Sequence, residues 1–215
     1  MLVDLADLSA SAVYHLLTQV VVPRPVAWVV SDNGTDGEER WNLAPFSYFN
    51  AVASNPPTVM FSMTASRREV TTRPGIKDTL ANVTDRPDHT IALPGREQLG
   101  AVEATSAEVA PGTSELALAG VEAVAWDWPV PRPSGVRAAL GCTVDRIVPV
   151  TGGPQRIVLA RVHRVWVDDV AVGEDAKGRV RVDPELLDPL VRLGAGEYAA
   201  LGTVVRPDRS GHARA

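Results

Sequence analysis

The chain has 215 residues, of which 45% are hydrophobic and 22% charged, and its formal net charge is −5. That length supports one sizeable core, and the mild acidity argues against a dedicated nucleic-acid binder, which would carry a basic patch. The single cysteine, Cys142, excludes an intramolecular disulfide and a cysteine-based metal site. No basic stretch followed by an apolar run opens the chain, and no segment reaches the roughly 18 apolar residues of a membrane helix. We therefore expect a cytoplasmic protein without membrane association.

The first third of the chain predicts one helix and three strands. Ser9 can cap a helix over residues 10–18, and prolines at positions 23 and 25 prevent its continuation. Runs rich in β-branched and aromatic residues predict strands over residues 25–30, 43–52 and 58–63. Residues 65–75 are polar and include three arginines, so we expect an exposed loop there.

The rest of the chain combines short helices with longer strands. Helical patterns cover residues 76–84, 96–106 and 114–119, and a short final helix begins at Asp183. Strands are expected over residues 89–93, 121–126, 136–150 and 156–170, with a hairpin turn at 151–154 joining the last two. Three prolines predict an irregular loop over residues 128–134. Antiparallel strands with few, peripheral helices favour a closed barrel.

Residues 41–50, Trp-Asn-Leu-Ala-Pro-Phe-Ser-Tyr-Phe-Asn, form the most informative segment. Small polar side chains stand between aromatic and apolar ones. This mixture suits a flat heteroaromatic ligand, which needs apolar walls and a few fixed hydrogen-bond partners. A half-buried strand interrupted by a kink also explains the segment.

Three further blocks accompany this segment. Pro-Arg-Pro-Val-Ala-Trp-Val-Val-Ser (23–31) precedes it, and Asn-Pro-Pro-Thr-Val-Met-Phe-Ser (55–62) and Lys-Asp-Thr-Leu-Ala-Asn (77–82) follow it. With Ala-Thr-Ser-Ala (104–107), Glu-Leu-Ala-Leu-Ala-Gly (115–120) and Arg-Leu-Gly-Ala-Gly-Glu-Tyr (192–198), the chain resembles the flavin reductase-like family from about residue 14 to residue 205. The resemblance implies a mainly β fold with peripheral helices, the FMN-binding split β-barrel, which is a Greek-key antiparallel barrel. We expect residues 1–207 to form this single domain and residues 208–215 to be a polar, disordered tail.

The last of these blocks also contains Gly-x-Gly-x-x-Ala, a variant of the dinucleotide-binding fingerprint, at residues 194–199. That motif requires a strand–helix–strand unit of roughly 30 residues, for which too little chain follows. We expect a loop closing the C-terminal helix instead, and the resemblance implies that Tyr198 lies near the active site.

The resemblance also implies how FMN is held. Lys77, Asp78 and Thr79 stand at a predicted helix start, where unpaired backbone N–H groups and the helix dipole favour an anion. A capped helix start explains these residues too, but in the family this block lies against the FMN phosphate, and Arg67 or Arg68 can lend a second charge. The other predicted cofactor contacts are Arg24, Trp28, Ser31, Asn42, Ala44, Ser47, Tyr48, Phe49, Asn50 and Ser62. Trp28 is equally well explained as a core residue.

The activity that the resemblance implies is NAD(P)H-dependent flavin reduction, with hydride passing from NADH or NADPH to the flavin. Two alternatives stay open: an FMN-dependent reductase of another small acceptor, and a flavin-binding electron carrier without nicotinamide activity. Hydride transfer requires no side-chain acid or base, so no catalytic residue is predicted. We expect no metal site.

The expected partners are a second copy of the chain, a small flavin or other acceptor, and a flavin-dependent monooxygenase. Relatives build their cofactor sites at a dimer interface. In addition, Trp126, Trp128 and the proline-rich loop predict more exposed apolar surface than a small monomer carries.

Overall fold

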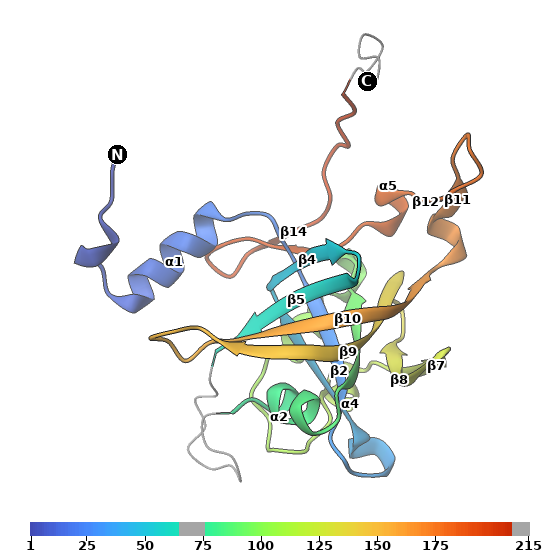
Figure 1. The fold of residues 1–215 in the computed structure, drawn as a ribbon, viewed down its shortest axis with the longest axis horizontal. Helices are drawn as coiled ribbons and strands as arrows, with labels where there is room; N and C mark the ends of the chain where they lie inside the picture. The colour runs from blue at the N-terminus through green and yellow to red at the C-terminus, as the bar shows by residue number, and fades with distance from the viewer. Residues whose placement is uncertain (65–75, 208–215) are drawn as a thin grey trace.

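The computed structural model describes residues 1–64 and 76–207. Its centre is a seven-stranded antiparallel sheet, in the order β3-β2-β6-β9-β10-β5-β4, that curls into a half-barrel (Figure 1). Its strands are β2 (Ala27–Asp32), β3 (Trp41–Phe46), β4 (Tyr48–Ser54), β5 (Pro57–Met63), β6 (Asp88–Leu93), β9 (Ala138–Pro149) and β10 (Arg156–Val167). The expected loop at 65–75 and the expected tail at 208–215 lie outside the described residues.

Three small sheets and a set of short helices surround this half-barrel. The small sheets are β1 (Arg24–Pro25) with β13 (Val191–Arg192) and β14 (Tyr198–Ala199), β7 (Ala123–Trp126) with β8 (Trp128–Pro133), and β11 (Val172–Glu174) with β12 (Val180–Val182). The α-helices are α1 (Ala10–Val20), α2 (Asp78–Asp85), α3 (Leu99–Ala104), α4 (Glu115–Ala119) and α5 (Pro184–Leu187). The 3-10 helices are η1 (Leu5–Asp7), η2 (Gly37–Arg40), η3 (Arg96–Gln98) and η4 (Asp169–Ala171).

Strand β2 separates two hydrophobic clusters and is buried on both faces. Because side chains alternate along a strand, Ala27 and Val29 point into the half-barrel and pack with Phe61 and other residues. Trp28 and Val30 point the other way, into a cluster completed by residues of α3, α4 and β8. A nearly continuous apolar run such as residues 26–30 is what a strand covered on both faces requires.

Most of the predicted elements are present, and the structure corrects three of them. The predicted loop at 128–134 is strand β8, which pairs with β7 at the margin of the fold, where prolines cost few ladder hydrogen bonds. The single strand predicted over 43–52 is two strands, β3 and β4, divided at Ser47. The predicted loop at 192–199 contains the short hairpin β13–β14, with Arg192 opposite Tyr198.

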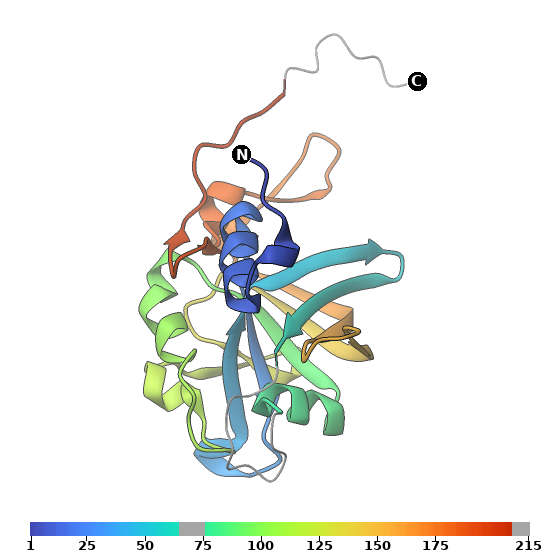
Figure 2. The same ribbon diagram turned by 90° about the vertical axis from the view of Figure 1, so that its left-hand side faces the viewer.

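The β4–β5 hairpin extends from the body of the half-barrel, and α1 lies near its base (Figure 2). Strand β4 is an edge strand and pairs only with β5 in its sheet. Of the helices in the described part of the chain, none is long and apolar enough to span a membrane.

Candidate functional site

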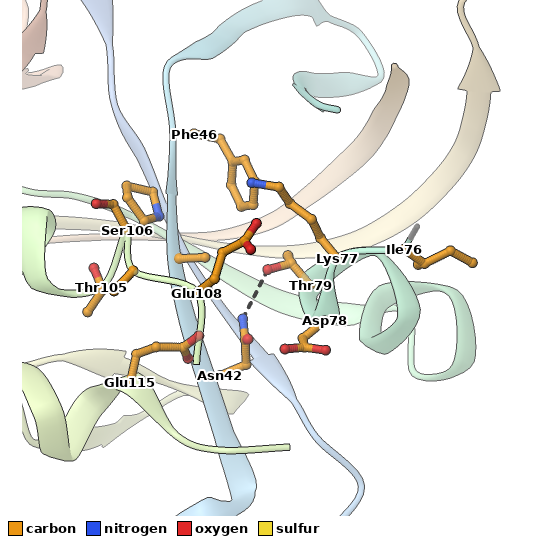
Figure 3. Close-up of a pocket in the computed structure, with 13 residues that line it drawn as sticks. Asn42, Phe46, Ile76, Lys77, Asp78, Thr79, Thr105, Ser106, Glu108 and Glu115 are labelled. Carbon is orange, nitrogen blue, oxygen red and sulfur yellow. Dashed lines mark hydrogen bonds between the residues drawn. The ribbon is translucent and has the colours of Figure 1, made fainter. Parts of the chain in front are cut away.

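A pocket of about 150 Å³ opens where strand β3, the start of α2 and the segment between α3 and α4 meet (Figure 3). Its walls are Asn42, Ala44, Pro45 and Phe46 of β3, Ile76, Lys77, Asp78 and Thr79 around the α2 start, and Thr105, Ser106, Ala107, Glu108 and Glu115. Two blocks that are far apart in the sequence, 41–50 and 77–82, therefore meet in one cavity.

The start of helix α2 forms one wall of this pocket. Lys77 is the N-cap residue, and its carbonyl oxygen accepts the first helical hydrogen bond, from Ala81 N, at 3.1 Å. The Lys77 ammonium group lies 5.8 Å from the centre of the Phe46 ring, on the pocket side (Figure 3). The first backbone N–H groups of a helix have no intrahelical acceptor and give this end a partial positive charge, so the start of α2 adds to the positive charge of Lys77 at this wall.

Behind this wall lies a layer of buried polar side chains, namely Ser31, Asn42, Thr79 and Asn82. The Asn42 amide donates to Thr79 Oγ1 at 3.0 Å and to Ser31 Oγ at 3.3 Å. The Asn82 amide donates to the same Ser31 oxygen at 3.2 Å. Asn42 is only 1% exposed, so its main polar contacts are with the hydroxyls of Ser31 and Thr79.

Carboxylates supply the opposite charge. Glu115 is 5% exposed, and its Oε2 accepts a hydrogen bond from Leu43 N at 2.9 Å. Its neighbour Ser114 donates its hydroxyl to the Trp41 carbonyl oxygen at 2.6 Å, so both residues hold α4 against β3. Together with Asp78 and Glu108, Glu115 gives the pocket three carboxylates beside one lysine. Such a cavity suits a ligand that carries an anionic end and also hydrogen-bond donors.

Sequence reasoning did not assign Thr105, Ser106, Glu108 or Glu115 to the site. Three of them lie in the blocks 104–107 and 115–120, which contribute to the family resemblance. That resemblance was the available signal, because nothing in the local sequence indicates that these segments fold against β3.

Five of the predicted cofactor residues line the pocket: Asn42, Ala44, Lys77, Asp78 and Thr79. Trp28 does not, because it is fully buried and donates its indole N–H to Thr105 Oγ1 at 2.8 Å. Arg24 is also buried, and its guanidinium donates to the carbonyl oxygens of Thr18, Val21 and Leu193. Ser31 lies behind the wall, and Arg67 lies outside the described residues.

The other predicted contacts do not line the pocket and lie directly after β3, in β4 and in β5. Ser47 lies directly after β3, and Tyr48, Phe49 and Asn50 begin β4, where Tyr48 pairs with Ser62 of β5. Tyr48 is partly exposed and lies next to α1, and burial together with the nearby Tyr14 raises its pKa. Tyr48 and Asn50 are exposed, whereas Phe49 packs against the hydrophobic cluster inside the half-barrel.

The flavin reductase-like domain model matches residues 20–188, which include every residue lining the pocket. The chain belongs to the flavin reductase-like family. Membership places it among flavin-binding proteins of oxidoreductase type and agrees with the split-barrel fold.

The chain is also similar to a curated protein and to solved structures. An uncharacterized protein of Deinococcus radiodurans is 33% identical over 198 residues, which cover 91% of this chain and 83% of that protein. Nitrilotriacetate monooxygenase component B from Bacillus cereus has a similar structure, with a TM-score of 0.82, 28% identity, and coverage of 96% of this chain and 98% of that one. The 2-nitrobenzoate 2-nitroreductase of Pseudomonas fluorescens shares the fold, with a TM-score of 0.82 and 21% identity over 100% of this chain and 99% of that one.

Within residues 1–64 and 76–207, no group of three or more His, Cys, Asp or Glu side chains is placed to hold a metal ion. Cys142 is buried in the half-barrel, and burial raises the pKa of its thiol to about 12, so the thiol stays protonated.

Proposed function

We propose that the protein binds FMN in this pocket and catalyses hydride transfer between NADH or NADPH and the flavin. The observation that carries the proposal is the meeting of Lys77, Thr79 and the start of α2 at one cavity in a flavin reductase-like chain. A phosphate monoester fits there, because it accepts hydrogen bonds and carries negative charge.

The acidic part of the pocket fits the rest of the same ligand. FMN carries ribityl hydroxyls and a ring N–H, which would donate to carboxylates such as Glu115 and Glu108 when FMN is bound. Bound flavin supplies the hydride chemistry, and the protein supplies position and electrostatics. The apolar wall at Pro45 and Phe46 suits contact with the ribityl chain and the edge of the ring.

We also propose that the working form is a homodimer. The pocket of about 150 Å³ is smaller than the roughly 300–1,000 Å³ of ordinary small-molecule sites, so one chain encloses only part of FMN. One apolar surface available for pairing lies on α1 and β4, where Tyr14, Val20 and Val52 are more than half exposed.

The sequence instead predicted that Trp126, Trp128 and the proline-rich loop would supply the apolar surface for dimer formation. Both indoles of Trp126 and Trp128 are half-buried, and they donate to the carbonyl oxygens of Val130 (2.8 Å) and His89 (3.2 Å). Light scattering should give twice the chain mass of 22.9 kDa for the FMN-loaded protein. A mass of one chain would refute the dimer.

The phosphate assignment is tested by changing Lys77 to methionine, which keeps most of the side-chain length and removes the charge. Because charge-assisted hydrogen bonds contribute about 1.5–3 kcal/mol, FMN affinity should fall by roughly one to two decades. Riboflavin, which lacks the phosphate, should bind as before. Lys177→Met is a matched control, since Lys177 lies in the turn between β11 and β12, outside the pocket. If the parent, Lys77→Met and Lys177→Met bind FMN with equal affinity, the phosphate lies elsewhere.

The activity itself is tested by mixing FMN-loaded protein with NADH and with NADPH under anaerobic conditions. Rapid bleaching of the flavin absorbance by either nucleotide is the expected result. Bleaching by dithionite alone would instead support the electron carrier. If the nucleotides bleach the flavin, turnover with added free flavin and with other small acceptors then distinguishes flavin reduction from reduction of another small molecule. We also propose a flavin-dependent monooxygenase as the protein partner to test first.

A further inference from the structure

The buried polar layer behind the pocket is a hydrogen-bonded network in which Asn82 and Asn42 each donate to two neighbours and Ser31 accepts from both. It runs from Asn33 through Asn82 and Ser31 to Asn42 and Thr79. The last four of these residues are at most 6% exposed, and two of them, Asn42 and Thr79, also line the pocket near the expected phosphate.

Backbone carbonyls set the direction at the Asn33 end. The Asn33 amide nitrogen donates to the carbonyl oxygens of Glu39 at 2.8 Å and Gly112 at 3.4 Å. Since a carbonyl oxygen can only accept, the side-chain oxygen of Asn33 faces Asn82 and accepts from its amide at 2.8 Å. The Asn82 amide nitrogen then also donates to Ser31 Oγ at 3.2 Å.

Asn42 continues this pattern toward the pocket. Its amide nitrogen has two hydrogens and lies 3.3 Å from Ser31 Oγ and 3.0 Å from Thr79 Oγ1. A hydroxyl that accepts a hydrogen bond on its oxygen keeps one hydrogen to donate. The Thr79 hydroxyl therefore keeps its hydrogen for an acceptor other than the Asn42 amide nitrogen, and Thr79 lines the cavity (Figure 3).

We propose that Asn42 is a positioning residue: by donating to Thr79 Oγ1 it holds the Thr79 hydroxyl as a donor toward a phosphate monoester. This inference rests on the proposed FMN site and deepens it. Phosphate oxygens only accept hydrogen bonds, so a hydroxyl fixed as a donor favours them. Asn42 thereby contributes to the preference for FMN over riboflavin from a place where it is almost completely buried.

The test is the ratio of FMN to riboflavin affinity in a double-mutant cycle, measured by calorimetric titration. Thr79→Val keeps the shape and removes the hydroxyl, so the ratio should fall by roughly 10–100-fold, the equivalent of one hydrogen bond to a charged group. Asn42→Leu keeps the approximate volume and frees the hydroxyl to rotate. The ratio of FMN to riboflavin affinity should then fall by roughly 3–10-fold, because FMN binding must fix the rotation of the Thr79 hydroxyl. In the double variant the ratio should match that of Thr79→Val alone.

A second Asn42 variant covers the case in which Asn42→Leu does not fold. Asn42→Asp keeps the shape, but its carboxylate accepts from Thr79 and draws the hydroxyl hydrogen away from the pocket. The ratio should then fall at least as far as in Thr79→Val. Thermal unfolding of each variant shows whether the comparison is between folded proteins.

The outcomes separate this inference from the proposed function. If the parent prefers FMN and Thr79→Val loses that preference while both Asn42 variants keep it, Asn42 has no positioning role and the phosphate site stands. If neither residue affects the preference, the inference is overturned and Lys77 alone marks the phosphate. If the parent binds FMN no better than riboflavin, the phosphate site and the inference both fall.

Discussion

The buried histidine of strand β6 should make the protein sensitive to mild acid. His89 has no exposed surface, and its Nδ1 lies 3.0 Å from the Pro87 carbonyl oxygen, so Nδ1 carries the proton of the neutral ring. Its Nε2 is buried without a hydrogen-bond partner in the described parts of the chain, and the centroids of the His89 and Phe61 rings are 5.7 Å apart. Burial lowers the pKa of His89 from 6.5 to about 4, although the Pro87 hydrogen bond and the charge of Asp88 oppose the shift.

The size and sign of the effect follow from this pKa. Above pH 6.5 His89 is neutral in the folded and the unfolded chain and adds no pH dependence. Between pH 6.5 and about 4 the unfolded chain binds a proton that the folded chain does not. The free energy of unfolding should therefore fall by about 1.4 kcal/mol per pH unit, and by about 3 kcal/mol over the whole interval.

Urea unfolding at several pH values between about 4 and about 8 measures this slope. His89→Asn keeps a donor near the Pro87 carbonyl and removes the titrating group, so its stability should fall less steeply with acid. The exposed histidines His15 and His163 are present in both proteins, so their contribution cancels in the difference. Parallel pH dependences of the parent and His89→Asn would refute the reasoning.

Three further substitutions, one of them a control, test packing and hydrogen bonding at positions that do not line the pocket. In Gly141→Ala the new Cβ would lie 2.7–2.8 Å from atoms of the Trp128 indole, so stability should fall by about 1–3 kcal/mol. Gly173→Ala, where a Cβ meets nothing within 4 Å, should be neutral or slightly stabilising, and equal urea midpoints of the two variants would contradict this account. Trp28→Phe removes the 2.8 Å hydrogen bond to Thr105 and should cost about 1–3 kcal/mol while FMN affinity stays unchanged. Weaker FMN binding without loss of stability would instead place Trp28 at the cofactor.

Much of the fold was readable in the sequence because its signals are local. The Ser9 hydroxyl accepts from Ala12 N at 3.2 Å and caps α1, as expected. The hairpin turn at residues 151–154 joins β9 to β10, and α2 begins beside Lys77. A cap, a tight turn and a strand of β-branched residues each depend on neighbours a few positions away, so their residues alone predict them. Family membership followed from several such blocks in one order.

The buried polar layer, and which residues lie in the core or reach the pocket, depended on the tertiary structure. Residues 128–133 form a strand because β7 lies beside them, and Trp28 belongs to the core because α3 brings Thr105 to its indole. Glu115 reaches the pocket because α4 packs on β3, 72 positions away along the chain from its partner Leu43. The sequence alone determined that a helix begins near Lys77. Only the fold decided that Asn42 of a distant strand would contact Thr79 there, because such contacts depend on how the half-barrel closes and not on the local pattern.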